Sequence, residues 1–198
     1  MDTERIVNEL NGVMNRLTYA YSSAQILRSI EHQFQCGNKD IFIGRDINFW
    51  RVVTDNCAFR VLAELAKIYD EDRESAGLHT IFNQVEQTEK GKATDILQVV
   101  RLRYDRVKDK RDKLKLLRDK GLFHSDKRYA GDLKELTSKN RFLPDDQDAL
   151  IECAAQICNK LLEYYTGQQR AIETLFPCDV GGIVEDVKKA KDVNGVDG

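Results

Sequence analysis

The chain has 198 residues, 41% of them hydrophobic, and its 33 acidic and 31 basic side chains give a formal net charge of -2. This length suits one domain with a sizeable core, and the charge excludes nucleic-acid binding driven by the overall charge of the chain. The sequence has no apolar run long enough to span a membrane, and its five scattered cysteines form no CxxC pair, so we expect a cytoplasmic protein with reduced thiols.

Apolar residues at helical spacing dominate the chain, which has only two prolines. The first expected helix runs from near Thr3 to Phe34. The segment 39–46 follows as a loop, with its apolar residues tucked onto the body of the protein. A second helix, expected from about Ile47 to Tyr69, has an apolar face broad enough for a central helix.

Further along the chain, Ser75 is the expected cap of a short helix. A long helix is then expected from about Thr94 to Lys120, with Gly121 as its stop.

Pro144 and the acidic residues after it start the last strong helix, whose apolar stripe continues to Leu175. We therefore predict an all-α fold, an up-and-down bundle of four or five long helices with a short extra helix. Residues 1–176 are expected to form a single domain, and residues 177–198 a tail that is partly helical or disordered.

Dedicated metal and nucleotide sites are not expected. The three histidines, His32, His79 and His124, are far apart in sequence and lie in no HExxH or EF-hand pattern. His32 and His79 fit structural positions on their helices. The sequence also contains no phosphate-binding glycine loop, so we expect neither a metal nor another cofactor.

The charge is unevenly distributed. Between Arg101 and Arg128 the sequence has twelve lysines and arginines against five aspartates, an excess of seven positive charges on an otherwise acidic chain. Such a segment can attract a polyanion to one place. The alternative is a solvated helix face with mixed charges.

Within this segment, Arg118 and His124 are separated by five residues, with Gly121 between them. An arginine can hold a phosphate with its fixed guanidinium fork. A histidine titrates near neutral pH, so it can take the proton of an RNA 2′-hydroxyl or give one to the leaving 5′-oxygen. Taken alone, the pair fits an ordinary helix C-terminus better than a site.

The spacing of Arg118 and His124 resembles the motif of the HEPN superfamily (higher eukaryotes and prokaryotes nucleotide-binding), an Arg followed after four to six residues by a His. Asp119 matches the polar residue that often follows the arginine. The stretch from Trp50 to Asp70, with the charged loop and short helix after it, is similar to the abortive-infection AbiU-type branch. The resemblance covers roughly Ile47 to Leu175.

This resemblance implies a homodimeric, metal-independent endoribonuclease of phage defence by abortive infection or of a toxin-antitoxin system. Arg118 would be the phosphate clamp, His124 the acid or base and Asp119 a polar supporter, with the motifs of two copies facing each other across the dimer cleft. The side chains expected to bind RNA are the nearby basic ones, Lys113, Lys115, Lys120, Lys127 and Arg128.

Two other hypotheses stay open. The first is a non-catalytic HEPN-like dimer that binds RNA, a nucleotide or a partner protein such as an antitoxin or a nucleotidyltransferase. The second is a purely structural dimer in which Arg118 pairs internally with an acid such as Asp119.

Overall fold

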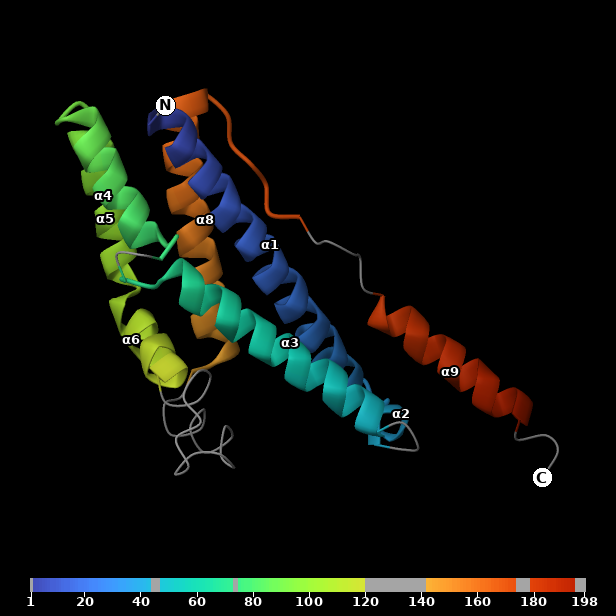
Figure 1. Cartoon of the computed structure of the whole chain (residues 1–198). Helices are drawn as coiled ribbons and strands as arrows, with labels where there is room; N and C mark the ends of the chain where they lie inside the picture. Colours follow the sequence, from blue (N-terminus) through green and yellow to red (C-terminus); the bar gives the residue numbers. More distant parts are fainter. Residues whose placement is uncertain (1, 44–46, 73–74, 120–141, 174–178, 195–198) are drawn as a thin grey trace.

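The fold is all-helical in the part of the chain that the computed structural model describes, residues 2–43, 47–72, 75–119, 142–173 and 179–194. The helices are α1 (Asp2–Gln35), α2 (Lys39–Ile43), α3 (Ile47–Ile68), α4 (Leu78–Glu89), α5 (Thr94–Arg106), α6 (Lys108–Leu117), α8 (Pro144–Thr166) and α9 (Val180–Asn194). Figure 1 shows α1, α3 and α8 side by side, with α4, α5 and α6 along one flank. The prediction of an all-α helical bundle is confirmed.

The core forms where the apolar stripes of these helices meet. Leu10 of α1, Leu65 of α3 and Ile157 of α8 are fully buried in one cluster, together with residues of α4, α5 and α6. Burial of these stripes supplies the main stabilisation of the bundle. Two of the cysteines, Cys153 and Cys158, lie in this core as free thiols, and burial raises the pKa of both, so they behave as small apolar residues.

The prediction of one long helix over Thr94–Lys120 is wrong, because the helix breaks at Val107 into α5 and α6. Val107 has φ -104° and ψ 19°, and its carbonyl accepts hydrogen bonds from the N–H groups of Lys110 and Arg111. Val107 and Leu114 of α6 are both buried in the core, so the break leaves the apolar face of the expected helix covered.

Two local predictions need correction between α1 and α4. The segment expected as a loop begins with the five-residue helix α2, although its Phe42 is buried as expected. The cap of α4 is Gly77 rather than Ser75. The Ser75 hydroxyl instead donates to the carbonyl oxygen of Asp72, at 2.8 Å.

The start of α8 at Pro144 is confirmed, but its expected extension toward Leu175 is wrong. The helix ends at Thr166, and Gly167 caps it in the left-handed region with φ 70°. A glycine at this position is the usual helix stop. Ile172 therefore packs against the core from outside the helix, and Leu175 lies outside the described residues.

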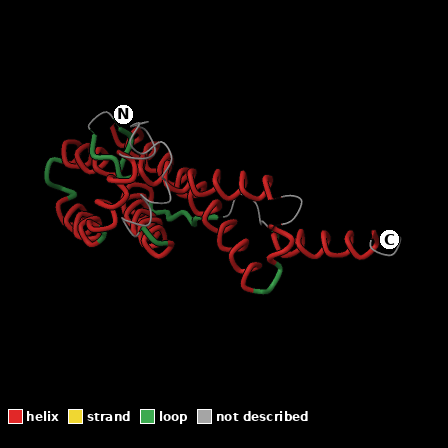
Figure 2. Tube along the Cα trace, turned by 90° about the horizontal axis from the view of Figure 1, so that it is seen from below, coloured by secondary structure: helices red, strands yellow, loops and turns green. Residues whose placement is uncertain are grey.

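A second, smaller cluster holds the C-terminal helix. Val180 and Val184 of α9 are buried with Ile30 and Trp50, and Figure 2 shows α9 projecting beyond the bundle. The domain boundary at residue 176 stays a prediction. None of the described helices combines the length and apolarity that crossing a bilayer requires.

Candidate functional site

Arg118 lies at the C-terminal cap of α6. Its backbone N–H donates to the carbonyls of Leu114 and Lys115, and the chain forms a π turn at Arg118 and Asp119. π turns occur at helix C-termini. The Arg118 side chain is 25% exposed, so its guanidinium is partly desolvated and still reachable from solvent.

Two carboxylates hold this guanidinium. Its Nη1 donates to Asp70 Oδ1 and its Nε donates to Asp119 Oδ1, both at 2.8 Å. Partial burial opposes the charge of Arg118, but the hydrogen bonds and charges of Asp119 and Asp70 outweigh it and raise the pKa of the arginine. The described residues therefore occupy two of the five N–H groups that a guanidinium offers.

Asp70 comes from the turn directly after α3, so the ion pair joins the end of α3 to the end of α6. The same Asp70 carboxylate accepts from the backbone N–H of Asp72, at 3.3 Å. Gly77 packs against this turn so closely that an added Cβ would lie 2.7 Å from the carbonyl oxygen of Asp70. The backbone around Asp70 is thus tightly constrained.

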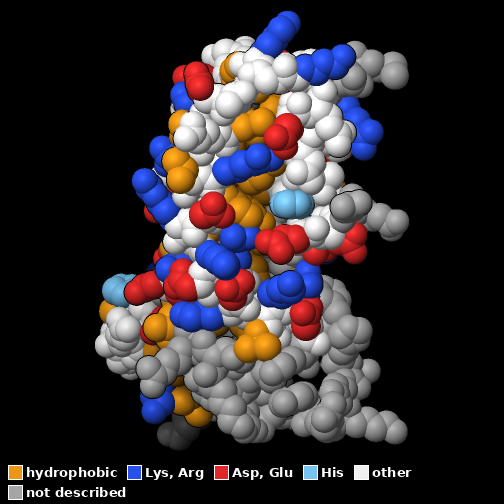
Figure 3. Space-filling model, turned by 90° about the vertical axis from the view of Figure 1, so that its left-hand side faces the viewer, with side chains coloured by type: hydrophobic (Ala, Val, Ile, Leu, Met, Phe, Trp, Pro, Cys, Tyr) orange, Lys and Arg blue, Asp and Glu red, His pale blue; other side chains and the backbone are white. Residues whose placement is uncertain are grey.

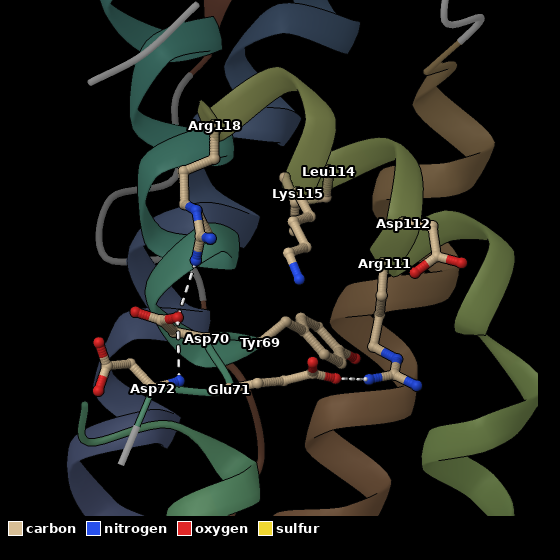
Figure 4. Close-up of a pocket in the computed structure, with 10 residues that line it drawn as sticks. Tyr69, Asp70, Glu71, Asp72, Arg111, Asp112, Leu114, Lys115 and Arg118 are labelled. Atoms are coloured by element: carbon tan, nitrogen blue, oxygen red, sulfur yellow. Dashed lines mark hydrogen bonds and ion pairs between the residues drawn. The ribbon is translucent and has the colours of Figure 1, made fainter. Parts of the chain in front are cut away.

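The Arg118–Asp70 pair lines a cavity of about 300 Å³. Figure 4 shows Arg111, Lys115 and Arg118 reaching into it from α6. Arg111 is held in place because it donates to Glu71 at 2.8 Å and lies 3.6 Å from the centre of the Tyr104 ring.

The described residues of this cavity carry no excess of positive charge. Three cations face four carboxylates, the latter being Asp70, Glu71, Asp72 and Asp112. Lys115 is exposed, and no ion pair of it with another described residue is found. An RNA phosphate would therefore meet a near-neutral pocket unless further residues complete it.

Ion pairs also neutralise much of the basic segment around this cavity. Arg101 contacts Glu86 of α4 at 2.7 Å, and Lys113 contacts Asp146 of α8 at 3.0 Å. In Figure 3, which looks onto the flank of α4, α5 and α6, lysines and arginines alternate with acidic side chains. Among the side chains expected to bind RNA, Lys113 thus already has a structural partner.

Several predicted site residues lie outside the described part of the chain. They are His124, Lys120, Lys127 and Arg128. The structure brings together Arg118, Asp119 and Lys115, and it leaves the placement of His124 untested. No cluster of three or more potential metal-binding side chains is found in the described residues.

Asp70 is the part of this site that the sequence analysis missed. It belongs to the stretch that resembles the AbiU-type branch, but no role was expected for it. Two features of the sequence could have indicated it. An arginine at the edge of an apolar helix face needs a partner, and an acidic residue directly after a neighbouring helix can supply one.

The described residues form a helical bundle, and the arginine of the Arg-x5-His spacing lies at the end of a helix. This is the arrangement expected of a HEPN protein. The family model of AbiU2 (HEPN AbiU2) matches residues 38–177, and the chain belongs to this family. No significant match exists among curated proteins or solved structures.

Proposed function

We propose that this chain is a metal-independent endoribonuclease of a cytoplasmic defence system, either abortive infection or a toxin-antitoxin pair. The observation that carries the proposal is the position of Arg118. It lies at the end of α6 and on the rim of a pocket, in a member of a HEPN family.

In the proposed reaction the 2′-oxygen of RNA attacks the adjacent phosphorus and the bond to the 5′-oxygen breaks. His124 takes the proton of the 2′-hydroxyl or gives one to the leaving oxygen. Arg118 stabilises the charge that develops on the phosphate. The products are a 2′,3′-cyclic phosphate and a 5′-hydroxyl, and no step requires a redox change.

The site is proposed to be completed by two copies. The near-neutral charge of the pocket in one copy supports this, because a cavity with three cations and four carboxylates attracts a polyanion poorly. The motif of a second copy, with Lys120, Lys127 and Arg128, would add positive charge at the cleft.

Replacement of either motif residue tests the proposal. We expect Arg118→Ala and His124→Ala to lower RNA cleavage by at least a hundredfold, because general acid-base catalysis and phosphate stabilisation are each worth about this much. Cleavage is measured with excess EDTA, and the 5′-hydroxyl ends are quantified by labelling with a polynucleotide kinase.

His32→Ala is the matched control, since His32 is exposed at the end of α1 and should not affect the rate. Helix content and melting temperature show that each variant folds. Unchanged cleavage by His124→Ala, or loss of wild-type activity in EDTA, would refute the proposal.

A second candidate function is favoured by the pairing of Arg118 with Asp70 and Asp119 at 2.8 Å each. An arginine held by two carboxylates suits a non-catalytic dimer that binds RNA, a nucleotide, or a partner such as an antitoxin or a nucleotidyltransferase. Salt-sensitive RNA binding without any cleavage product, at high protein concentration, distinguishes this candidate.

A further inference from the structure

The cavity beside Arg118 contains a carboxylate that is held in a fixed position. Arg111 Nη1 donates to Glu71 Oε1 at 2.8 Å, and the Arg111 side chain is only 10% exposed. The Arg111 guanidinium also lies 3.6 Å from the centre of the Tyr104 ring, and its Nη2 lies 3.9 Å from Asp105 Oδ1. Arg111 is therefore held by three neighbours, and it holds Glu71 at the wall of the cavity.

The reachable part of this ion pair is Glu71. Its side chain is 52% exposed, and its second oxygen, Oε2, has no hydrogen-bond partner among the described residues. Arg111 Nε is buried and is likewise unpartnered in the described part of the chain. An unsatisfied buried N–H is unfavourable for folding, so stability alone does not explain the position of Arg111. The pair instead presents a carboxylate oxygen to whatever enters the cavity.

A hydrogen-bond donor lies in the same cavity. Figure 4 shows Lys115 extending from α6 toward Tyr69 and Glu71. With three cations and four carboxylates on its walls, the cavity suits an uncharged group that carries both donors and acceptors better than a phosphate. Its volume of about 300 Å³ lies at the small end of ligand pockets, which fits one flat ring system rather than a whole nucleotide.

Glu71 is also close to the arginine that is proposed to hold the phosphate. Glu71 directly follows Asp70, so their Cα atoms are about 3.8 Å apart, and Asp70 accepts from Arg118 at 2.8 Å. In Figure 4 the Asp70 side chain points toward Arg118, whereas Glu71 points toward Arg111. A phosphate at Arg118 and a base at Glu71 can therefore belong to the same nucleotide.

Guanine is the RNA base that matches this set of side chains. A carboxylate accepts two N–H groups that lie side by side, and guanine offers its N1–H and its N2 amino group on one edge. A lysine donates to guanine O6. Adenine and cytosine present an unprotonated ring nitrogen on the corresponding edge, which a carboxylate repels, and uracil offers only one N–H there.

We propose that this cavity binds the guanine base of the nucleotide whose 2′-hydroxyl attacks, with Glu71 accepting from N1 and N2 and Lys115 donating to O6. The inference rests on the proposed function, because Arg118 is there the contact of the phosphate. Cleavage then falls on the 3′ side of guanosine, and the 5′ fragments end in guanosine 2′,3′-cyclic phosphate. Fixing the base also fixes the attacking hydroxyl near the phosphorus.

Binding of nucleoside monophosphates tests the cavity without any cleavage. Guanosine 3′-monophosphate and adenosine 3′-monophosphate are titrated separately into the wild-type protein, and NMR shift changes give the two dissociation constants. We expect guanosine 3′-monophosphate to bind at least about tenfold more tightly, as a paired contact to a base edge typically provides. Equal dissociation constants, or no binding of either compound at millimolar concentration, overturn the proposal.

Glu71→Gln tests the residue that reads the base. The glutamine amide still accepts from Arg111 but offers guanine only one acceptor, so the preference for guanosine 3′-monophosphate should fall about tenfold. Asp112→Asn is the matched control. It removes the same charge from the same cavity, but Figure 4 shows the Asp112 carboxylate beyond Arg111, away from Tyr69, so the preference should persist. Full preference in Glu71→Gln, or an equal loss in both variants, overturns the assignment.

Mapping of the cleaved ends separates this inference from the proposed function. An RNA that contains all four bases is digested by the wild type in EDTA, and the 3′ ends of the fragments are sequenced. We expect ends at guanosine, and a lower share of them with Glu71→Gln. Equal cleavage after all four bases overturns the guanine site and leaves the ribonuclease intact. Selective binding of guanosine 3′-monophosphate without cleavage of any RNA supports the guanine site and refutes the ribonuclease.

Discussion

At the scale of single residues, Asp70 is one of the two carboxylates that hold Arg118. Asp70 accepts from the guanidinium at 2.8 Å, and together with Asp119 it offsets the positive charge to which the proposed function assigns phosphate binding. The arginine could be predicted from the sequence because its spacing to His124 is local. Its partner could not, because 48 residues separate Asp70 from Arg118 and only the packing of α3 against α6 joins them.

We predict that Asp70→Asn strengthens RNA binding about fivefold, because it removes one negative charge near the phosphate while its amide oxygen still accepts from Arg118. Fluorescence anisotropy with a labelled RNA at low salt measures this. Glu86→Gln, which removes an equal charge beside Arg101, is the control and should have a smaller effect. Weaker or unchanged binding by Asp70→Asn would mean that RNA does not enter this pocket.

Asp146 is the residue that fastens α6 to the start of α8. Its carboxylate accepts from the Leu143 backbone N–H at 3.1 Å and from Lys113 at 3.0 Å. Burial favours the protonated acid, but these two donors and the charge of Lys110 outweigh it and lower the pKa of Asp146. Since the folded pKa is the lower one, Asp146 stabilises the fold above the pKa of the unfolded chain and loses this effect as the pH falls.

Asp146→Asn should therefore cost about 2 kcal/mol of unfolding free energy near neutral pH, a typical value for hydrogen bonds to a charged group. Below about pH 4 its difference from the wild type should shrink. Urea unfolding at several pH values measures both effects. Asp145→Asn, exposed on the same helical turn, is the control, and an equal loss in both variants would contradict the role of Asp146.

At the scale of elements, the helix pattern predicted most segments, and the errors have physical causes. The break at Val107 has no proline or glycine beside it, so the sequence carries no local signal for it. The end of α8 had a visible signal in Gly167, which adopts φ 70°. Apolar residues after Gly167 continue the helical spacing and therefore hid this signal. One of them, Ile172, packs against the core as part of a loop.

The approach of α4 to the end of α3 gives a sharp test of this packing. Gly77→Ala should destabilise the fold by about 2 kcal/mol, because its Cβ would lie 2.7 Å from the Asp70 carbonyl oxygen. Gly12→Ala is the matched control. It has no atom within 4 Å of its added Cβ and lies inside α1, so it should stabilise the fold by roughly 0.5 to 1 kcal/mol.

Thermal unfolding of the two variants measures these opposite effects. An unchanged melting temperature for Gly77→Ala would mean that the turn around Asp70 tolerates a shift. In that case the position of Asp70, and with it the geometry of Arg118, is less constrained than the packing indicates.

At the scale of the whole molecule, the fold class followed from the sequence, whereas the distribution of charge did not. The basic excess of residues 101–128 predicted a polyanion surface, but acidic residues from other parts of the chain pair with it, among them Glu71 of the turn after α3 and Asp146 of α8. A count of charges along the sequence does not show which acidic side chains from other parts of the chain lie beside the basic ones. The exposed apolar residues of α3, Phe49, Val52 and Phe59, were also missed, because the helical pattern was considered only on the side of α3 that faces the core.

The most direct test of the account is RNA cleavage by the purified chain in excess EDTA, with the wild type compared with His124→Ala. The account predicts fragments with 5′-hydroxyl ends from the wild type and at least a hundredfold fewer from the variant. Equal cleavage by the two proteins, or no cleavage by the wild type at any concentration at which it binds RNA, would contradict it.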